Sequence, residues 1–166
     1  MYGVLKSMEE SGNVRRGYFV SGLGAAQFAL PGAVDRLRSE RRPPDDDRVD
    51  SVVVLAATDP ANPYGAAVPW PESDGRPARA AGAQVVLVDG EPAVWLERGG
   101  RSLVTFEPAQ RTDRWADALV SLVKEGRVSR LTIQKIDGEA AASSPHAGVL
   151  RAAGFGEGYR GLTLHA

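Results

Sequence analysis

The spacing of hydrophobic and polar residues near the start of the chain predicts a helix followed by a β-hairpin. Val4, Leu5 and Met8 are spaced like residues on one face of a helix over positions 2–11. In the next stretch, 12–30, an alternating run that ends in aromatic and β-branched residues is broken by glycines and then resumes. Such runs separated by a glycine-rich tip are typical of two strands joined by a turn.

A helix followed by a hairpin with a basic first strand is the second half of a winged helix. The two helices that would complete the core of such a domain do not precede it, so we expect the chain to be a piece of a longer protein. A further helix is predicted from Pro31 to Arg38, because proline suits the first turn of a helix. We therefore assign residues 1–42 to the C-terminal part of a winged-helix domain.

The composition changes abruptly at residues 43–50, whose sequence is PPDDDRVD. Two prolines and an acidic run are typical of a linker, so we place the domain boundary here. The acidic run is interpreted as a solvated loop, and a metal-binding role is the less favoured alternative. Before this boundary, residues 1–42 carry seven basic and four acidic side chains, whereas the whole chain has a net charge of −1. The first module is therefore locally positive.

Residues 51–166 read as a second module of mixed strands and helices. A β-branched run at 51–57 predicts a buried strand, and three further strands are predicted between 84 and 106. The Asp89-Gly90 pair between apolar runs is a strong hairpin signal. The last third alternates helix, strand, helix and strand. We predict an α+β fold in which a small antiparallel β-barrel is packed against helices.

Composition excludes several classes of site. The chain has 43% hydrophobic and 25% charged residues, which is typical of a soluble globular protein. It has no cysteine and only two histidines, far apart, so we expect neither a disulfide nor a metal site. No apolar run approaches the roughly 18 residues that span a bilayer. The N-terminus lacks the pattern of a signal peptide, so the expected location is the cytoplasm with no membrane partner.

Known catalytic and cofactor motifs are absent from the sequence. There is no phosphate-binding P-loop, no complete dinucleotide fingerprint and no G-x-S-x-G nucleophile elbow. Neither histidine has a sequence context that supports a serine–histidine–aspartate triad. We therefore predict no bound cofactor and identify no catalytic residue.

Three residues of the predicted hairpin are candidates for contact with nucleic acid. Arg15, Arg16 and Tyr18 lie on its first strand, where Arg16 and Tyr18 share one face and Arg15 belongs to the other. A strand laid along a duplex would offer such side chains to phosphate groups, which position a protein without reading base sequence. The alternative is that Tyr18 and Phe19 pack the hairpin and the arginines are solvated; for Phe19 packing is favoured.

A second group of candidates lies in a proline-fixed loop of the second module. Asn62 and Tyr64 would be presented there on a rigid loop, as binding residues often are. The favoured alternative is that Asp59 and Asn62 bond to their own backbone as Asx turns. Trp70, between two prolines, is the tryptophan most expected to be exposed and could stack on a base. The other tryptophans, Trp95 and Trp115, fall on strand and helix positions that predict core packing.

Several long strings resemble the C-terminal end of Lhr, the large helicase-related proteins of superfamily 2. The resemblance covers nearly all of the chain. It is carried by GNVRRGYFV at 12–20, GLGAAQFALPGAVDRLR at 22–38, DPANPYG at 59–65 with WP at 70–71, RPARAAGA at 76–83 and GFGEGYRGLTL at 154–164. In that family an ATP- and Mg²⁺-dependent core of two RecA-like domains precedes winged helices. Long bacterial members add a β-barrel module similar to the AlkZ-type DNA glycosylases.

The resemblance implies three alternative functions. The first is a DNA-binding segment of an ATP-dependent DNA helicase involved in DNA repair, without an ATPase motor because the motor's motifs map to no position here. The second is a glycosylase-like module that excises a damaged or deaminated base. The AlkZ-type Gln-x-Gln pair has no counterpart in this sequence. Asp59 and Asp137 are candidates for activating water, on the grounds of residue type alone. The third is an assembly module. The partners expected are DNA, the helicase domains of the same polypeptide and a second copy of the chain.

Overall fold

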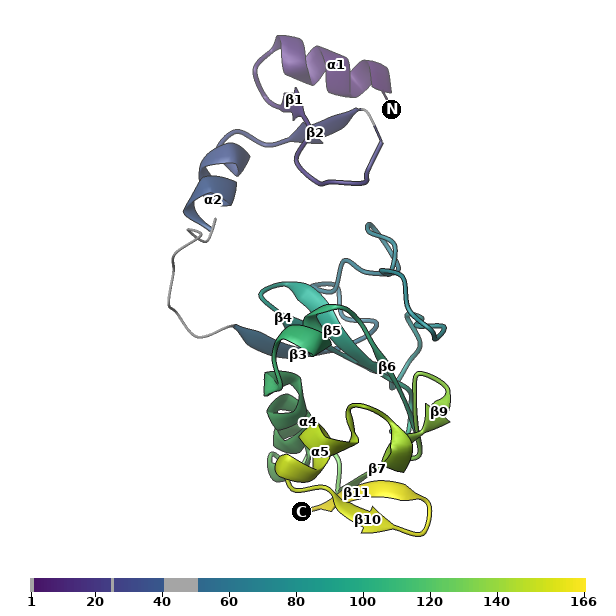
Figure 1. Ribbon diagram of the computed structural model, residues 1–166. Coiled ribbons are helices and arrows are strands. Elements are labelled where there is room, and N and C mark those ends of the chain that lie inside the picture. Colours follow the sequence, from purple (N-terminus) through teal and green to yellow (C-terminus); the bar gives the residue numbers. More distant parts are fainter. Residues whose placement is uncertain (1, 25, 41–50) are drawn as a thin grey trace. The chain divides into compact units, whose positions relative to one another are not determined.

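A computed structural model describes residues 2–24, 26–40 and 51–166 of the chain (Figure 1). The contacts between residues divide the chain into two compact units, 1–48 and 49–166, and each unit is described by itself. The predicted linker at 43–50 lies outside the described residues. None of the helices in the described part of the chain has the length and apolar character that crossing a bilayer requires.

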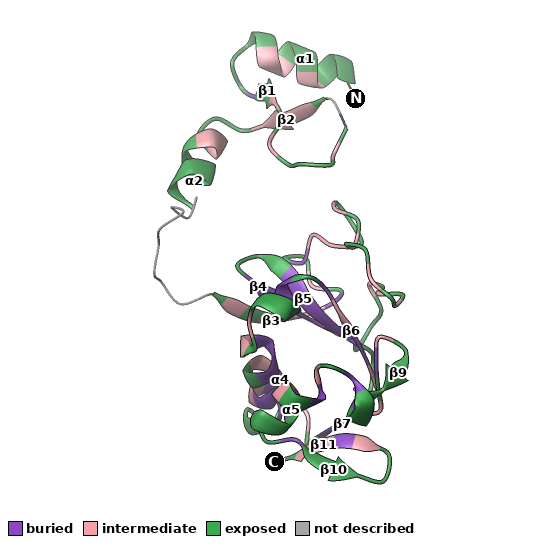
Figure 2. Ribbon diagram, in the orientation of Figure 1, coloured by how far each residue is buried: buried purple, intermediate pink, exposed green. Residues whose placement is uncertain are grey.

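Unit 1 contains the predicted helix and hairpin. Its elements are α1 (Tyr2–Glu10), β1 (Arg15–Gly17), β2 (Gln27–Ala29) and α2 (Ala33–Ser39). The two strands pair antiparallel, with Arg16 opposite Phe28. Tyr2 of α1 lies edge-on against Phe28, at 6.0 Å between ring centroids. Val14 is the one buried residue among those described in unit 1 (Figure 2), so this unit has little apolar core of its own.

The glycine-rich tip of the hairpin is held by the side chain of Gln27. Its Oε1 accepts hydrogen bonds from the backbone N–H groups of Phe19 and Val20, at 2.8 and 2.7 Å. Its Nε2 donates to the carbonyl oxygens of Val20 and Leu23, at 2.8 and 2.9 Å. The single amide therefore satisfies four backbone groups that no strand ladder reaches, which fixes a tip that is otherwise irregular.

Unit 2 is an α+β structure, as predicted, with its strands in two sheets. The larger sheet has the order β3-β4-β5-β6-β8-β9 and the smaller one β10-β11-β7. All pairs are antiparallel except β6 with β8. Closure of these sheets into a barrel stays a prediction. The strands are β3 (Val52–Ala56), β4 (Gln84–Val88), β5 (Glu91–Leu96), β6 (Ser102–Thr105), β7 (Arg130–Ile133), β8 (Lys135–Ile136), β9 (Glu139–Ala140), β10 (Gly156–Gly158) and β11 (Gly161–His165).

Local sequence explains the turns that order this sheet. Asp89 and Gly90 both have positive φ, 48° and 84°, as a two-residue hairpin turn between β4 and β5 requires. Between β7 and β8 the chain leaves one sheet and enters the other. At this crossing, the backbone N–H groups of Gln134 and Lys135 both donate to the carbonyl oxygen of Arg101, at 2.8 and 3.0 Å. The crossing thus brings Arg101 beside β7.

The two faces of the larger sheet are covered differently. One face packs on α3 (Pro108–Arg111) and α4 (Arg114–Lys124), whereas the 3₁₀ turn η1 (Ala141–Ser143) and α5 (Ala147–Ala152) pack beside β11 of the smaller sheet. Here α4 buries the predicted stripe of Trp115, Leu119, Leu122 and Val123 (Figure 2). Burying such side chains contributes roughly 1.5–3 kcal/mol each.

The opposite face of the sheet carries a smaller cluster that includes Trp95 and Phe106. Trp95 and Trp115 are therefore core residues, as predicted. Trp70 is half-buried and packs against this smaller cluster, so the expectation of an exposed Trp70 is only partly met. Its ring stacks with those of Tyr64 and Phe106.

Candidate nucleic-acid interface

The three candidate residues of the hairpin in unit 1 differ in their surroundings. Arg15 is exposed, whereas the Nε of Arg16 lies 3.5 Å from Glu9 Oε1 and its Nη1 lies 3.5 Å from the Tyr2 hydroxyl. Tyr18 follows the end of β1 and is 82% exposed. The ring of Phe19 packs beside Gly17, where an added Cβ would lie 3.1 Å from it, which confirms the packing role. Arg15 and Tyr18 are thus open to a ligand, and Arg16 already has a partner.

The Asn62 side chain forms hydrogen bonds within its own loop. Its side chain is 1% exposed, its Nδ2 donates to the Ala57 carbonyl at 2.9 Å, and its Oδ1 accepts from the Tyr64 backbone N–H at 3.1 Å. Asp59 Oδ1 likewise accepts from the Ala61 N–H at 2.8 Å. The Asx-turn alternative is therefore correct for both residues. A buried amide with these partners cannot reach a nucleic acid, because exposing it would break the hydrogen bonds that shape the loop.

Tyr64 and Trp70 belong to a stack of aromatic rings. The Tyr64 and Trp70 centroids lie 5.9 Å apart, and Trp70 continues onto Phe106 at 6.1 Å with an interplanar angle of 9°. Gly65 permits this packing, since a Cβ there would meet Trp70 Nε1 at 2.3 Å. Tyr64 donates its hydroxyl to the Gly90 carbonyl at 3.1 Å. Burial, and secondarily the Glu91 carboxylate, raises the pKa of the Tyr64 hydroxyl above its ordinary value of 10.0.

The loop that carries these rings is clamped by Arg79. Its guanidinium donates to the carbonyl oxygens of Asn62, Thr58 and Asp59, at 2.5, 3.1 and 3.1 Å. Trp95 Nε1 donates to the carbonyl oxygen of Ala78, the residue before Arg79, at 3.0 Å. These hydrogen bonds fix the loop in place. Most of its polar groups are therefore already engaged in hydrogen bonds within the protein.

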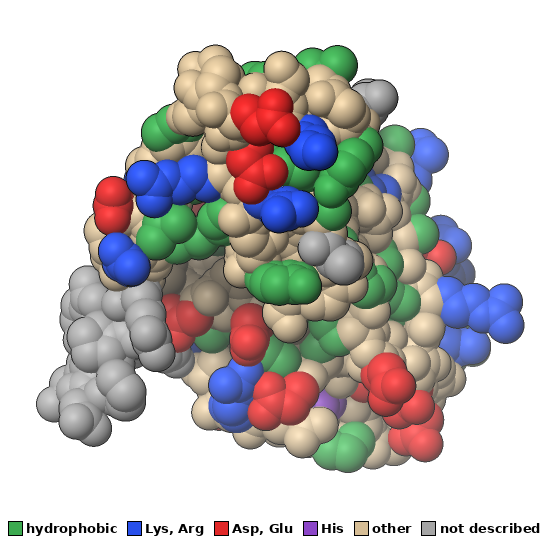
Figure 3. Space-filling model, turned by 90° about the horizontal axis from the view of Figure 1, so that it is seen from above, with side chains coloured by type: hydrophobic (Ala, Val, Ile, Leu, Met, Phe, Trp, Pro, Cys, Tyr) green, Lys and Arg blue, Asp and Glu red, His purple; other side chains and the backbone are tan. Residues whose placement is uncertain are grey.

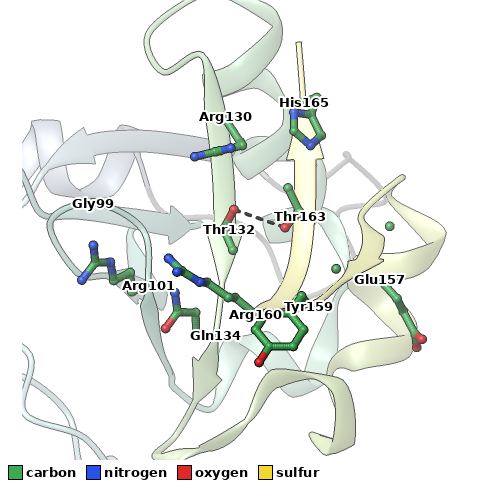
Figure 4. Close-up of a pocket in the computed structure, with 12 residues that line it drawn as sticks. Gly99, Arg101, Arg130, Thr132, Gln134, Glu157, Tyr159, Arg160, Thr163 and His165 are labelled. Atoms are coloured by element: carbon green, nitrogen blue, oxygen red, sulfur yellow. Dashed lines mark hydrogen bonds between the residues drawn. The ribbon is translucent and has the colours of Figure 1, made fainter.

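The structure gathers a group of side chains that the sequence pattern did not single out. A hollow of about 610 Å³ lies over the outer face of β7 and β11, and we call it the arginine hollow (Figure 4). Because Leu131, Ile133 and Leu162 face the core, the alternate positions on these strands point into the hollow. Its lining residues are Gly99, Arg101, Arg130, Thr132, Gln134, Gly156, Glu157, Gly158, Tyr159, Arg160, Thr163 and His165.

Two hairpin turns complete the arginine hollow. Arg101 follows the turn between β5 and β6, and the two-residue turn Tyr159-Arg160 joins β10 to β11. Figure 4 shows the guanidinium groups of Arg101, Arg130 and Arg160 on one side of Thr132, with Tyr159 and His165 on the other. The Tyr159 side chain is fully exposed.

The charges in this hollow differ from those on the face that Figure 3 shows. On the face that Figure 3 shows, acidic and basic side chains are interspersed. In the hollow, none of the three arginine side chains has an ion pair or hydrogen bond with another described residue. The one carboxylate in the lining, Glu157, is held by Arg151 at 2.7 Å and points away from the arginines in Figure 4. Like charges gathered without a counter-charge favour an anionic ligand.

The carboxylates considered for activating water are both engaged. The Asp137 carboxylate accepts from the Thr105 backbone N–H at 2.7 Å and from the Thr105 hydroxyl at 2.6 Å. Asp59 is held in its Asx turn. Within the described ranges there is no group of three or more carboxylate and imidazole side chains that could hold a metal ion. The geometry therefore offers phosphate contact and base stacking more readily than hydrolysis.

Comparison with known proteins relates this chain to one family of helicase-related proteins. Residues 1–49 match the family described as "Large helicase-related protein, winged-helix domain". "Lhr helicase/ probable uracil glycosylase" of Mycolicibacterium smegmatis (strain ATCC 700084 / mc(2)155) is 52% identical in an alignment over 146 residues that covers 84% of this chain and 10% of that protein. "Lhr helicase/uracil glycosylase" of Escherichia coli (strain K12) is 34% identical over 166 residues, 98% of this chain and 11% of that protein. The chain spans about a tenth of the length of these curated relatives. It belongs to the large helicase-related, or Lhr, family.

Proposed function

We propose that this chain is a DNA-binding segment of an Lhr-type DNA helicase that acts in DNA repair, and that the arginine hollow is its main contact with DNA. The relatives that it matches are named helicases. ATP and Mg²⁺ serve the helicase core by resemblance, and the sequence has no phosphate-binding loop to hold them. The segment therefore contributes binding and not motor activity.

The observation that carries the proposal is the set of three guanidinium groups, without partners among the described residues, in one hollow beside an exposed tyrosine. Arginine binds phosphate oxygens through a planar fork of donors, so Arg101, Arg130 and Arg160 can each take a backbone phosphate. At the floor, the Thr163 hydroxyl donates to the Thr132 hydroxyl at 3.2 Å, which leaves the Thr132 O–H to donate to a ligand. Tyr159 offers a free ring face, and stacking a base on such a ring contributes about 1–3 kcal/mol.

The hairpin of unit 1 is proposed as a second contact. Arg15 and Tyr18 are exposed there, and the unit matches a winged-helix family. Arg16 would have to leave Glu9 to bind phosphate, so its contribution is expected to be smaller. Tyr64 and Trp70 support the loop of unit 2 and are not part of the proposed interface.

The test is the salt dependence of DNA binding, measured by fluorescence anisotropy with a labelled single-stranded oligonucleotide. Each phosphate contact on a single strand contributes about 0.7 to the slope of log K against log salt concentration. Replacing Arg101, Arg130 and Arg160 by glutamine should therefore lower the slope by about 2. The ratio of the wild-type to the variant binding constant should fall about eighteenfold when the salt concentration is raised from 50 to 200 mM.

The control replaces three other exposed arginines, Arg36, Arg98 and Arg127, by glutamine, which changes the net charge equally. It should retain most of the wild-type slope. Equal slopes for the two triple variants would show that general charge, and not the arginine hollow, drives binding. Light scattering on the same samples tests the assembly alternative, which predicts a multimer without DNA affinity.

Excision of uracil is a second candidate function, favoured by the names of both relatives. In the arginine hollow, Gln134 is half-buried and carries an amide that can pair with the edge of a base. Incubation with an oligonucleotide that contains one uracil should then yield an abasic site. Replacing Gln134 by alanine should abolish the product while changing DNA affinity less than about twofold. An intact oligonucleotide after incubation with wild-type protein would leave DNA binding as the sole proposed function.

A further inference from the structure

A second surface of unit 2 shares no lining residue with the arginine hollow and has the opposite charge. Two adjoining hollows of about 580 and 330 Å³ have Glu72, Phe106 and Glu107 in common. Together they form a groove between the loop that follows Trp70 and the corner where β6 meets α3. We call it the acidic groove, and its lining residues are Tyr64, Pro71, Glu72, Ser73, Asp74, Glu91, Pro92, Thr105, Phe106, Glu107, Pro108, Gln110 and Asp137.

The apolar part of the acidic groove is made of rings. Tyr64 and Phe106 belong to the aromatic stack through Trp70, and three prolines lie in the lining beside them. Phe106, Pro92 and Pro108 are buried beneath the groove, whereas Tyr64 is half-buried and Pro71 is exposed. The rings are fixed by the packing of the loop, so this part of the groove is formed before any ligand arrives. Surfaces lined by aromatic and proline rings suit segments in the extended polyproline conformation, whose own prolines pack flat against them.

The rim of the acidic groove is negative. Five carboxylates line it, those of Glu72, Asp74, Glu91, Glu107 and Asp137, and Asp137 is engaged by Thr105. Arg111 bridges two of the others, with its Nη2 at 2.5 Å from Glu91 Oε2 and 2.8 Å from Glu107 Oε2.

The Arg111 bridge shows that this rim accommodates a guanidinium group. Glu72 and Asp74 have no partner among the described residues. They therefore remain available to a second cation. DNA is excluded as the occupant, because its phosphates carry the same charge as the rim.

We propose that the acidic groove binds an extended, proline-containing basic peptide segment of a partner protein. Its prolines pack against the accessible parts of Tyr64 and Pro71, and its arginine or lysine side chains pair with Glu72 and Asp74. The charge of the rim selects a basic segment, and the rings select an extended one. Unit 2 would then hold DNA on one surface and a protein on another, without competition between them.

The probe is a fluorescein-labelled dodecapeptide with two Pro-x-x-Pro turns and two arginines, titrated with the full chain. The dissociation constant is expected to lie below about 1 mM. It should rise about fivefold in the Glu72→Gln, Asp74→Asn variant, since each exposed ion pair contributes about 0.2–1 kcal/mol. Both substituted residues are exposed, so the fold should be unaffected. The matched control, Glu97→Gln with Glu139→Gln, removes the same charge elsewhere and should bind like wild type.

Two altered peptides test the chemistry of the occupant. Glutamate in place of arginine should abolish binding, and alanine in place of proline should weaken it at least threefold. Equal binding of the basic and acidic peptides, no effect of the Glu72 and Asp74 substitutions, or no binding at about 1 mM would overturn the proposal. Self-association that the same two substitutions remove would also overturn it and would identify a second copy as the occupant. DNA binding is measured in parallel. If the chain does not bind DNA, the proposed function fails, but the conclusion drawn from peptide binding still stands.

Discussion

Replacing Gly161 by alanine tests whether the base of the β10–β11 turn is as tightly fitted as the structure shows. Gly161 has φ 135°, and an added Cβ would lie 2.2 Å from the Ile133 carbonyl oxygen and 2.9 Å from Gln134 Cα. Ordinary contacts begin near 3.4 Å, so the backbones of β11 and β7 would have to separate by more than 1 Å. The same glycine positions Tyr159 and Arg160, so the change also bears on the proposed DNA contact.

The expected cost has two parts. A backbone conformation that side chains rarely adopt costs about 1–3 kcal/mol. Separating the strands weakens ladder hydrogen bonds between β7 and β11, at about 0.5–1.5 kcal/mol each, and we expect about two to be affected. Together these parts lower the free energy of unfolding by about 2–6 kcal/mol. Gly138→Ala is the matched control, because Gly138 also has positive φ, 84°, but an added Cβ there would meet nothing within 4 Å.

The assay is urea unfolding followed by tryptophan fluorescence, which reports on unit 2 because all three tryptophans, Trp70, Trp95 and Trp115, lie in it. Gly161→Ala should destabilise this unit by about 2 kcal/mol more than Gly138→Ala does. Equal losses in the two variants, within about 0.5 kcal/mol, would refute the close approach of β11 to β7 as the cause.

Two further predictions concern single side chains. Because the pKa of Tyr64 is raised in the folded state by burial and by Glu91, the unfolded chain loses this proton first as pH rises through about 10. The stability of unit 2 should therefore fall above that pH, and Tyr64→Phe should flatten this fall in urea unfolding measured across pH. An unchanged fall in the variant would contradict the assignment. Gln27→Ala should remove the four hydrogen bonds at the tip of the hairpin and lower the stability of unit 1 by about 1–2 kcal/mol. Hydrogen exchange by NMR should then show lost protection of the Phe19 and Val20 amides, and unchanged protection would contradict the role assigned to Gln27.

Interactions between near neighbours in the chain were readable from the sequence. The helix at the N-terminus, the hairpin after it and the Asp89-Gly90 turn all depend on residues a few positions apart, and each is present. The apolar stripe of α4 was visible for the same reason, since helical spacing alone places Trp115 and Leu119 on one face. The long strings shared with the Lhr proteins also lie within short stretches, so the family was recognisable without a structure.

Only the tertiary structure could decide whether the polar residues of the proline-fixed loop bind a ligand or close turns. Asn62 and Asp59 are equally compatible, by sequence, with binding a ligand or with closing a turn. Burial decided the matter for Asn62, because Arg79 and the sheet close over its loop and leave its amide only backbone partners. Trp70 was judged exposed from its flanking prolines, but Phe106, far along the chain, supplies the ring that covers it.

The sequence by itself determined the helix–hairpin unit, the turns, the helical core stripe and the family. It could not reveal the arginine hollow, because Arg101, Arg130 and Arg160 come from three separate segments and form no motif. They meet only because the chain crosses between sheets after β7 and because the β10–β11 turn folds back beside it. Local spacing fixes which face of a strand or helix a residue lies on. Long-range strand pairing decides which of these faces share a surface, and the proposed DNA contact depends on that pairing.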